Sequence, residues 1–286
     1  MEWLIEFPEA VHLPLSLWVD ALVDWLDAAF EPLFDGIALY LGQVLRAIEQ
    51  GLLAAPWSLL TAMLVALGWR VGGWRMAGGV LAGFLFIGSL GMWEPAMSTL
   101  AIVITATLLA VVVAVPTGIA MARSDLLDRL LRPLLDLMQT MPSFVYLIPA
   151  IMLFSLGPVP ALLATFIYAV PPAIRLTNLG IRQVDHELVE AARAFGSTSG
   201  QMLMKVQLPL ALPTIMAGIN QTIMMALAMV VIASMIGAGG LGQAVLRGIS
   251  QLKVGEGFVG GISIVVLAII IDRLTERLAP QRGGSP

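Results

Sequence analysis

The sequence predicts an all-α integral membrane protein with about seven transmembrane helices, and three observations support this class. Hydrophobic residues make up 59% of the 286 residues, charged residues only 12%, and the mean hydropathy is +0.93. A soluble domain carries roughly 25% charged residues, so half that share indicates a chain that lies in lipid. Charge-free runs near the length of a membrane span recur along the chain. Cysteine is absent, which excludes disulfides, thiolate chemistry and cysteine-ligated metal sites.

The first 49 residues predict an amphipathic arm that lies on a surface. They hold nine acidic residues and one basic residue, Arg46. Four of the acids recur at helical spacing on one face, opposite a more apolar side: Asp20, Asp24, Asp27 and Glu31. Packing on the protein's own flank and contact with lipid are equal alternatives for this arm. The acidic start lacks the basic stretch of a cleavable signal peptide, so we expect insertion to use the later segments.

Charge-free runs mark the predicted spans, because about 20 apolar residues cross a hydrocarbon core. The run Leu137–Ile174 is too long for one helix, and the turn signal at Gly157–Pro160 divides it into two. The run Val206–Leu246 holds one span at 210–236, which the glycine cluster Gly237–Gly242 ends. The other spans are Gln50–Trp69, Met76–Trp93, Ala96–Met121 and Gly257–Ile271.

Basic residues set the predicted orientation, with the N-terminus outside and the C-terminus inside. Three of the 15 Lys and Arg residues then face out, namely Arg46, Arg247 and Lys253. The reverse orientation would place the twelve others outside, which the positive-inside rule disfavours. These predictions divide the chain into an acidic extracytoplasmic arm (1–49), two additional transmembrane helices (50–93), a five-helix core (94–276) and a cytoplasmic tail (277–286).

A polar segment at residues 181–209 interrupts the spans, and its residues follow the pattern E-A-A-x3-G-x9-[IV]-x-L-P. Helical spacing predicts a short helix here, which the glycine would end. The proline suits the first turn of the following helix. An ordinary inner loop with an amphipathic helix is the alternative. The residues that match the pattern are Glu190, Ala191, Ala192, Gly196, Val206, Leu208 and Pro209.

This pattern resembles the cytoplasmic coupling loop of permease subunits in ABC importers, where a short helix docks on the ATPase. Three further segments, Asp136–Pro149, Pro171–Thr177 and Ile236–Gly242, resemble permeases for glycine betaine, proline betaine and choline. The resemblance covers about residues 94–275, and the earlier residues are similar only in outline. It identifies residues 94–276 as a type I importer transmembrane domain.

The resemblance implies a transport subunit, not an enzyme, that carries a betaine-like compatible solute across the bacterial inner membrane. The implied partners are a second copy of the permease, two cytoplasmic ATPase subunits that bind ATP and Mg²⁺, and an extracytoplasmic substrate-binding protein. The lipid bilayer surrounds the chain, and nothing implies nucleic acid. The choice among glycine betaine, proline betaine, choline and related amines is left open.

The residues themselves predict no cofactor or metal bound by this chain. A P-loop pattern, G-x4-G-K-[ST], does not occur, so ATP hydrolysis is expected on another subunit. The two histidines, His12 and His186, lie outside the predicted spans and far apart in sequence. A secondary carrier or channel without an ATPase is the alternative function. It is disfavoured because no acid or histidine falls in the middle of a span.

Neutral polar residues within the predicted spans are candidates for a translocation path. Each could equally hold two helices together, because interhelical hydrogen bonds stabilise membrane bundles. The candidates are Gln139, Thr140, Ser143, Asn220, Gln221, Thr222 and Ser234.

Overall fold

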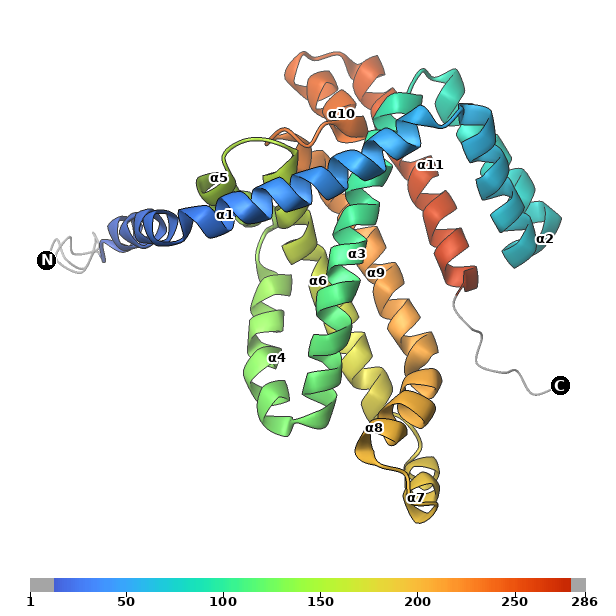
Figure 1. The fold of residues 1–286 in the computed structure, drawn as a ribbon. Helices are drawn as coiled ribbons and strands as arrows, with labels where there is room; N and C mark the ends of the chain where they lie inside the picture. Colours follow the sequence, from blue (N-terminus) through green and yellow to red (C-terminus); the bar gives the residue numbers. More distant parts are fainter. Residues whose placement is uncertain (1–12, 279–286) are drawn as a thin grey trace, which may run out of the picture.

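The computed structural model describes residues 13–278, and this part of the chain is helical without a β-strand (Figure 1). The predicted all-α class is therefore confirmed. Short 3-10 and π turns, Ser143–Tyr146 and Leu203–Gln207, join some of the α-helices. The α-helices are α1 (Leu15–Ala54), α2 (Trp57–Ser89), α3 (Trp93–Arg123), α4 (Asp125–Thr140), α5 (Leu147–Phe154), α6 (Pro158–Arg182), α7 (His186–Ala194), α8 (Ser199–Met202), α9 (Leu208–Ser234), α10 (Gly240–Ser250) and α11 (Val254–Leu278).

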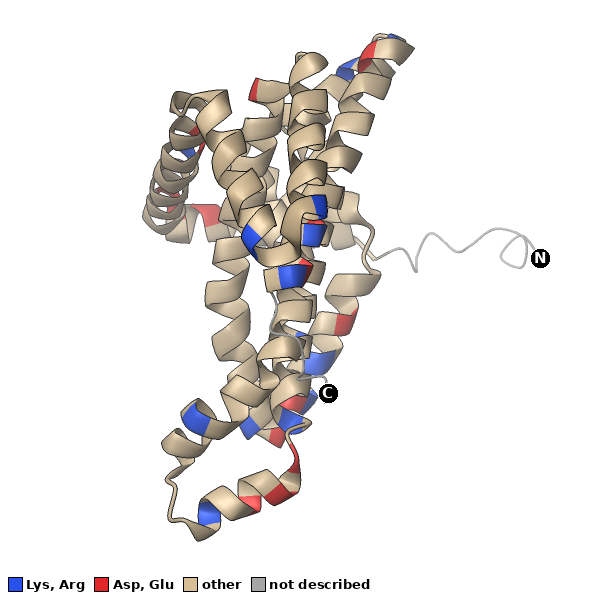
Figure 2. Ribbon diagram, turned by 90° about the vertical axis from the view of Figure 1, so that its right-hand side faces the viewer, with Lys and Arg blue, Asp and Glu red and all other residues tan. Residues whose placement is uncertain are grey.

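Five helical segments among the described residues are long and apolar enough to cross a membrane. They are α2, α3, α6, the continuous stretch Ser199–Ser234 and α11, and a sixth crossing results if α4 and the bent segment after it count as one span. The multi-span class is thus confirmed, whereas the number seven and the orientation stay predictions. Figure 2 shows charged residues on the protruding loop, on the nearby end of the bundle and on one flank, with a few at the opposite end.

The two predicted spans before residue 94 both fall on α2. The first is wrong at its start, because residues 50–54 continue α1 and the chain breaks at Pro56. The predicted interruption is found at Gly73, whose φ of 74° and ψ of −169° leave helical geometry. A Cβ on Gly68 would lie 3.4 Å from the Val80 side chain, so the two arms of α2 fold back on each other. Each arm of about 16 residues extends about 24 Å at 1.5 Å per residue.

The predicted span that starts at Leu137 is not a straight helix. The chain bends by 110° between α4 and the segment Ser143–Phe154. Met141 takes an extended conformation, with φ −67° and ψ 135°, because the ring of Pro142 disfavours helical geometry in the residue before it. The helix also begins twelve residues earlier than predicted, at Asp125, where the Ser124 side chain caps the backbone N–H of Leu127 at 3.3 Å.

The arm forms one long helix, α1, that lies across the bundle (Figure 1). Its C-terminal half packs on the core, where Gly42 lies against Val159 and the rings of Phe34 and Phe154 meet edge to face at 5.6 Å. Packing on the protein's own flank is therefore right for this half. Most side chains of residues 15–36 are exposed. Residues 1–12 of the arm lie outside the described residues.

Helices α3, α6 and α9 pack closely at the centre through small residues. A Cβ on Gly118 of α3 would lie 2.5 Å from Thr177 Cβ, and one on Gly218 of α9 would lie 2.9 Å from Leu176 Cβ, both on α6. As predicted, the glycine cluster ends α9, and Gly237, Gly239 and Gly240 have φ values of 97°, 76° and 67°. These contacts fix the positions of α3, α6 and α9 at the end of the bundle that carries the protruding loop.

Candidate functional site: an exposed helix and a polar cavity at one end of the bundle

The predicted short helix in the loop at 181–209 is α7, which protrudes from one end of the bundle and has no buried residue (Figure 1). The Asp185 carboxylate begins it by accepting a hydrogen bond from the backbone N–H of Glu187 at 3.0 Å. Gly196, with φ 78°, ends it. The N–H of Ser197 donates to the carbonyl of Ala192 at 3.1 Å, and that of Gly196 to Arg193 at 2.9 Å. These are the paired bonds of a Schellman cap.

The exposed side of α7 carries apolar groups that the pattern did not single out. Leu188 is 47% exposed and Phe195 is 91% exposed, and Ala191 is also exposed. Spacings of three and four residues place these side chains on one face. Glu190 lies beside them and pairs with His186, whose Nδ1 is 3.3 Å from the Glu190 carboxylate. A sequence signal for Phe195 existed, because it is the one aromatic residue in a polar loop.

The second half of the motif anchors the loop to the bundle. Thr198 and Gln201 form a capping box at the start of α8, with hydrogen bonds of 3.0 and 3.3 Å. The Leu208 side chain packs against the cluster of Ile181 and Ala211, and Pro209 stands in the first turn of α9. Val206 is half-buried in the π turn before α9. The exposed residues 190–196 are thus held at a fixed position by residues 206–209.

Two of the seven candidate path residues share a cavity. Gln139 of α4 and Gln221 of α9 line a space of about 460 Å³ together with the ion pair of Arg175 and Asp136, whose Nη2–Oδ1 distance is 2.5 Å. The buried Nε of Arg175 has no hydrogen-bond partner within residues 13–278. The residues that line the cavity include two carboxylates, three guanidiniums and three amides.

The other candidates do not line this cavity. Asn220 donates to Asp272 at 3.0 Å and accepts a hydrogen bond from Thr275, so it joins α9 to α11. Thr222 is fully buried, and Ser234 is buried and donates to the carbonyl of Val231 at 2.6 Å. Asn220 thus has the alternative role of holding two helices together, whereas the buried Thr222 hydroxyl has no hydrogen-bond partner among residues 13–278. The assignment of the seven residues to a path stays a prediction. Thr140 donates to Leu137 at 3.0 Å and is exposed, and Ser143 is half-buried near the bend.

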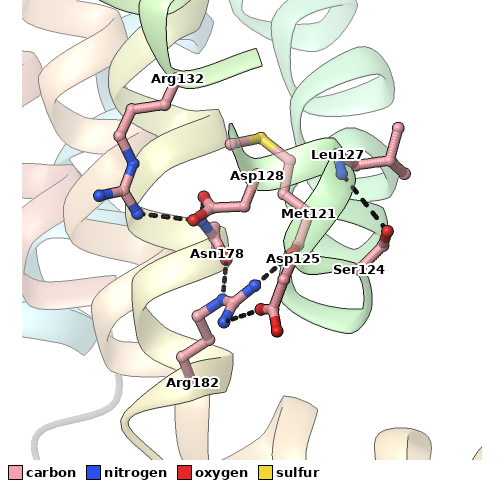
Figure 3. Close-up of polar contacts among 8 residues, drawn as sticks. All are labelled: Met121, Ser124, Asp125, Leu127, Asp128, Arg132, Asn178 and Arg182. Carbon is pink, nitrogen blue, oxygen red and sulfur yellow. Dashed lines mark hydrogen bonds and ion pairs between the residues drawn. The ribbon is translucent and has the colours of Figure 1, made fainter. Parts of the chain in front are cut away.

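A network of charged and amide side chains also lines this cavity, and Figure 3 shows its contacts. Asp128 of α4 is 8% exposed and accepts hydrogen bonds from Asn178 at 2.7 Å and from Arg132 at 2.6 Å. Arg182 of α6 donates to Asn178 at 2.9 Å and lies 2.8 Å from Asp125. A buried carboxylate needs such partners, because removal from water is costly.

The network ties the connection between α3 and α4 to the C-terminal part of α6. Arg182 also donates to the backbone carbonyl of Met121 at 2.8 Å, near the end of α3. Sequence reasoning used these charges only to orient the chain, since partners 50 residues apart leave no local pattern. Within residues 13–278, no group of three or more acidic or histidine side chains could hold a metal ion.

The chain resembles a family of membrane transport components over most of its core. Residues 114–283 match the family described as "Binding-protein-dependent transport system inner membrane component". The glycine betaine/proline betaine transport system permease protein ProW of Escherichia coli K12 is 51% identical and aligns over 92% of this chain and 75% of its own. The glycine betaine transport system permease protein OpuAB of Bacillus subtilis 168 is 50% identical over 93% of this chain and 95% of its own. The glycine betaine/carnitine transport permease protein GbuB of Listeria monocytogenes is 48% identical over 94% of this chain and 96% of its own.

The fold has a solved counterpart. A chain of the MetNI methionine ABC transporter, in an inward-facing conformation, superposes with a TM-score of 0.58 at 22% sequence identity. The superposition covers 65% of this chain and 94% of the other chain. At this identity the likeness establishes a shared fold, that of an ABC transporter membrane chain.

Proposed function

Because the chain belongs to the family of inner membrane components of binding-protein-dependent transport systems, we propose that it is the permease subunit of an ABC importer for a betaine-like compatible solute. It is a multi-pass protein of the bacterial inner membrane. The substrate class rests on the three relatives near 50% identity, each of which is named for glycine betaine and aligns over at least three quarters of its own length. Glycine betaine is therefore the first substrate to test.

The single observation that carries the proposal is the exposed apolar face of α7. The side chains of Leu188, Ala191 and Phe195 are exposed. The helix that carries them is capped at both ends, and its loop is anchored to α9. An apolar face of this kind fits the groove of a partner protein. We assign that partner as the cytoplasmic ATPase, whose closing would push the rigid protrusion and so move α6 and α9. ATP and Mg²⁺ then bind on the partner and not on this chain.

The course of the helices supports seven crossings with the N-terminus outside. The two arms of α2, the straight helices α3, α6, α9 and α11, and the bent pair α4 and α5 supply seven passes. With α7 inside, twelve of the 15 basic residues fall on the inner side. The arm α1 then lies at the outer surface, where the extracytoplasmic binding protein approaches.

The cavity of Gln139 and Gln221 is our candidate for part of the path. A betaine carries a cationic and an anionic group, which complement the Asp136 carboxylate and the Arg175 guanidinium. The cavity opens on one flank of a single chain. A second copy of the chain would enclose it, so a homodimer is the proposed assembly.

Uptake by proteoliposomes tests the function. The chain is reconstituted with its ATPase and binding protein, and labelled glycine betaine is supplied with ATP or with a non-hydrolysable analogue. Uptake that requires hydrolysis is expected. Equal uptake without hydrolysis, or in vesicles that lack the ATPase, would instead establish the carrier or channel alternative.

A further inference from the structure

Three arginine side chains from two helices line one cavity outside the proposed coupling loop and path. Arg75 of α2 and Arg273 and Arg277 of α11 face a space of about 590 Å³. The described residues that line it include no acidic side chain. Figure 2 views this flank and shows basic segments close together on it. The orientation of a membrane protein requires only that its basic residues lie on the inner side of the membrane. It does not require three arginine side chains to face the same cavity.

The cavity is a wedge that opens toward the arginines. Helices α2 and α11 touch at Gly83, where a Cβ would lie 2.6 Å from Ile270 Cδ1. One turn closer to the arginines, a Cβ on Gly79 would have no heavy atom within 4 Å. Glycine at position 79 therefore leaves room between the helices that a large side chain would occupy. Apolar side chains form the rest of the wall, namely Met76, Val80, Ile269 and Ile270.

The charges around the wedge are largely uncompensated. Glu276 pairs with Arg273 at 3.1 Å, with both side chains mostly exposed. Arg75 lies over the Trp74 ring, 5.5 Å from its centroid, which holds it near the wedge without neutralising it. Guanidinium groups form forked hydrogen bonds with phosphate oxygens. The wedge thus offers a net positive site with an apolar wall.

We propose that this wedge, lined by Arg75, Arg273 and Arg277, binds the phosphate headgroup of an anionic phospholipid. The phosphate would lie among the guanidinium groups, and an acyl chain would run along Met76, Val80 and Ile269. The apolar wall and the place at the ends of two membrane helices favour a lipid over a soluble phosphate. The bound lipid would tie the α2 hairpin to α11.

Native mass spectrometry of the full chain in detergent tests whether lipid binding depends on the arginine charges. The probe is phosphatidylglycerol, which is anionic, and the comparison is phosphatidylcholine, which is zwitterionic with no net charge. Arg75→Gln and Arg277→Gln should each weaken phosphatidylglycerol binding about fivefold, and the double variant about 30-fold, because one arginine near an anionic headgroup contributes about a factor of five. Arg70→Gln is the matched control, since Arg70 is close in sequence but does not line the wedge. Equal binding by the double variant and the wild type would overturn the proposal.

A pair of glycine variants tests whether lipid binding depends on the open space of the cavity. Neither variant changes a charge. Gly78 and Gly79 both have open space at the Cβ position, but only Gly79 lines the wedge. Gly79→Leu should lose phosphatidylglycerol binding and Gly78→Leu should retain it. Equal behaviour of these two variants would contradict the site. Displacement of the lipid by millimolar glycerol phosphate would assign the site to a soluble phosphate and overturn the lipid assignment.

Discussion

Replacing Phe195 by alanine is expected to weaken ATPase docking without affecting the fold. The ring is 91% exposed in the free chain, so its removal should change the free energy of unfolding by less than about 0.5 kcal/mol. Burial of a phenylalanine side chain in a partner groove contributes about 1.5–3 kcal/mol. Phe195→Ala should therefore weaken ATPase binding roughly 10- to 150-fold.

The assay measures the affinity of the purified ATPase for the detergent-solubilised permease, together with thermal unfolding of the permease alone. Phe258→Ala is the matched control, because Phe258 is 67% exposed but lies in the first turns of α11, away from the loop. Unchanged ATPase affinity for Phe195→Ala, or an equal loss for Phe258→Ala, would refute the reasoning about the α7 face.

Three further predictions concern the helices that carry the site. Asn178→Leu should lower the free energy of unfolding by about 3 kcal/mol, because it leaves the buried Asp128 short of a partner; an unchanged denaturant midpoint would contradict this. Gly118→Leu should prevent the close packing of α3 on α6 and reduce the yield of folded protein, whereas Gly200→Leu, with open space at its Cβ, should not. Asp136→Asn should lower glycine betaine uptake about tenfold with ATPase binding unchanged, and loss of both would point to a structural role.

Much of the architecture could be predicted from local sequence. Charge-free runs located α3, α6, α9 and α11 because the hydrocarbon core imposes a length and a composition. The end of α9 at the glycine cluster and the end of α7 at Gly196 followed from backbone freedom that only glycine has. The family resemblance drawn from the loop pattern is confirmed by the match over residues 114–283.

The features that the sequence analysis did not predict have physical causes that hydropathy and composition do not record. Hydropathy could not place the end of α1 at Ala54, since residues 50–54 carry no charge and continue directly into the charge-free run that follows. The bend at Pro142 interrupts a charge-free run, which composition alone cannot detect. Which neutral polar residues line a cavity depends on helix rotation, so Gln221 and Thr222, adjacent in sequence, point to different surroundings. The partnership of Asp128 with Asn178 joins residues 50 positions apart.

Single-cysteine labelling tests the central claim, that α7 stands on the inner side and docks on the ATPase. The chain has no cysteine, so Ala194→Cys introduces a unique thiol at an exposed position of α7 and keeps Leu188, Ala191 and Phe195 of the apolar face. A membrane-impermeant maleimide should label inside-out vesicles and not right-side-out vesicles, and added ATPase should protect the thiol. Labelling from the outer face, or equal labelling with and without the ATPase, would contradict the account.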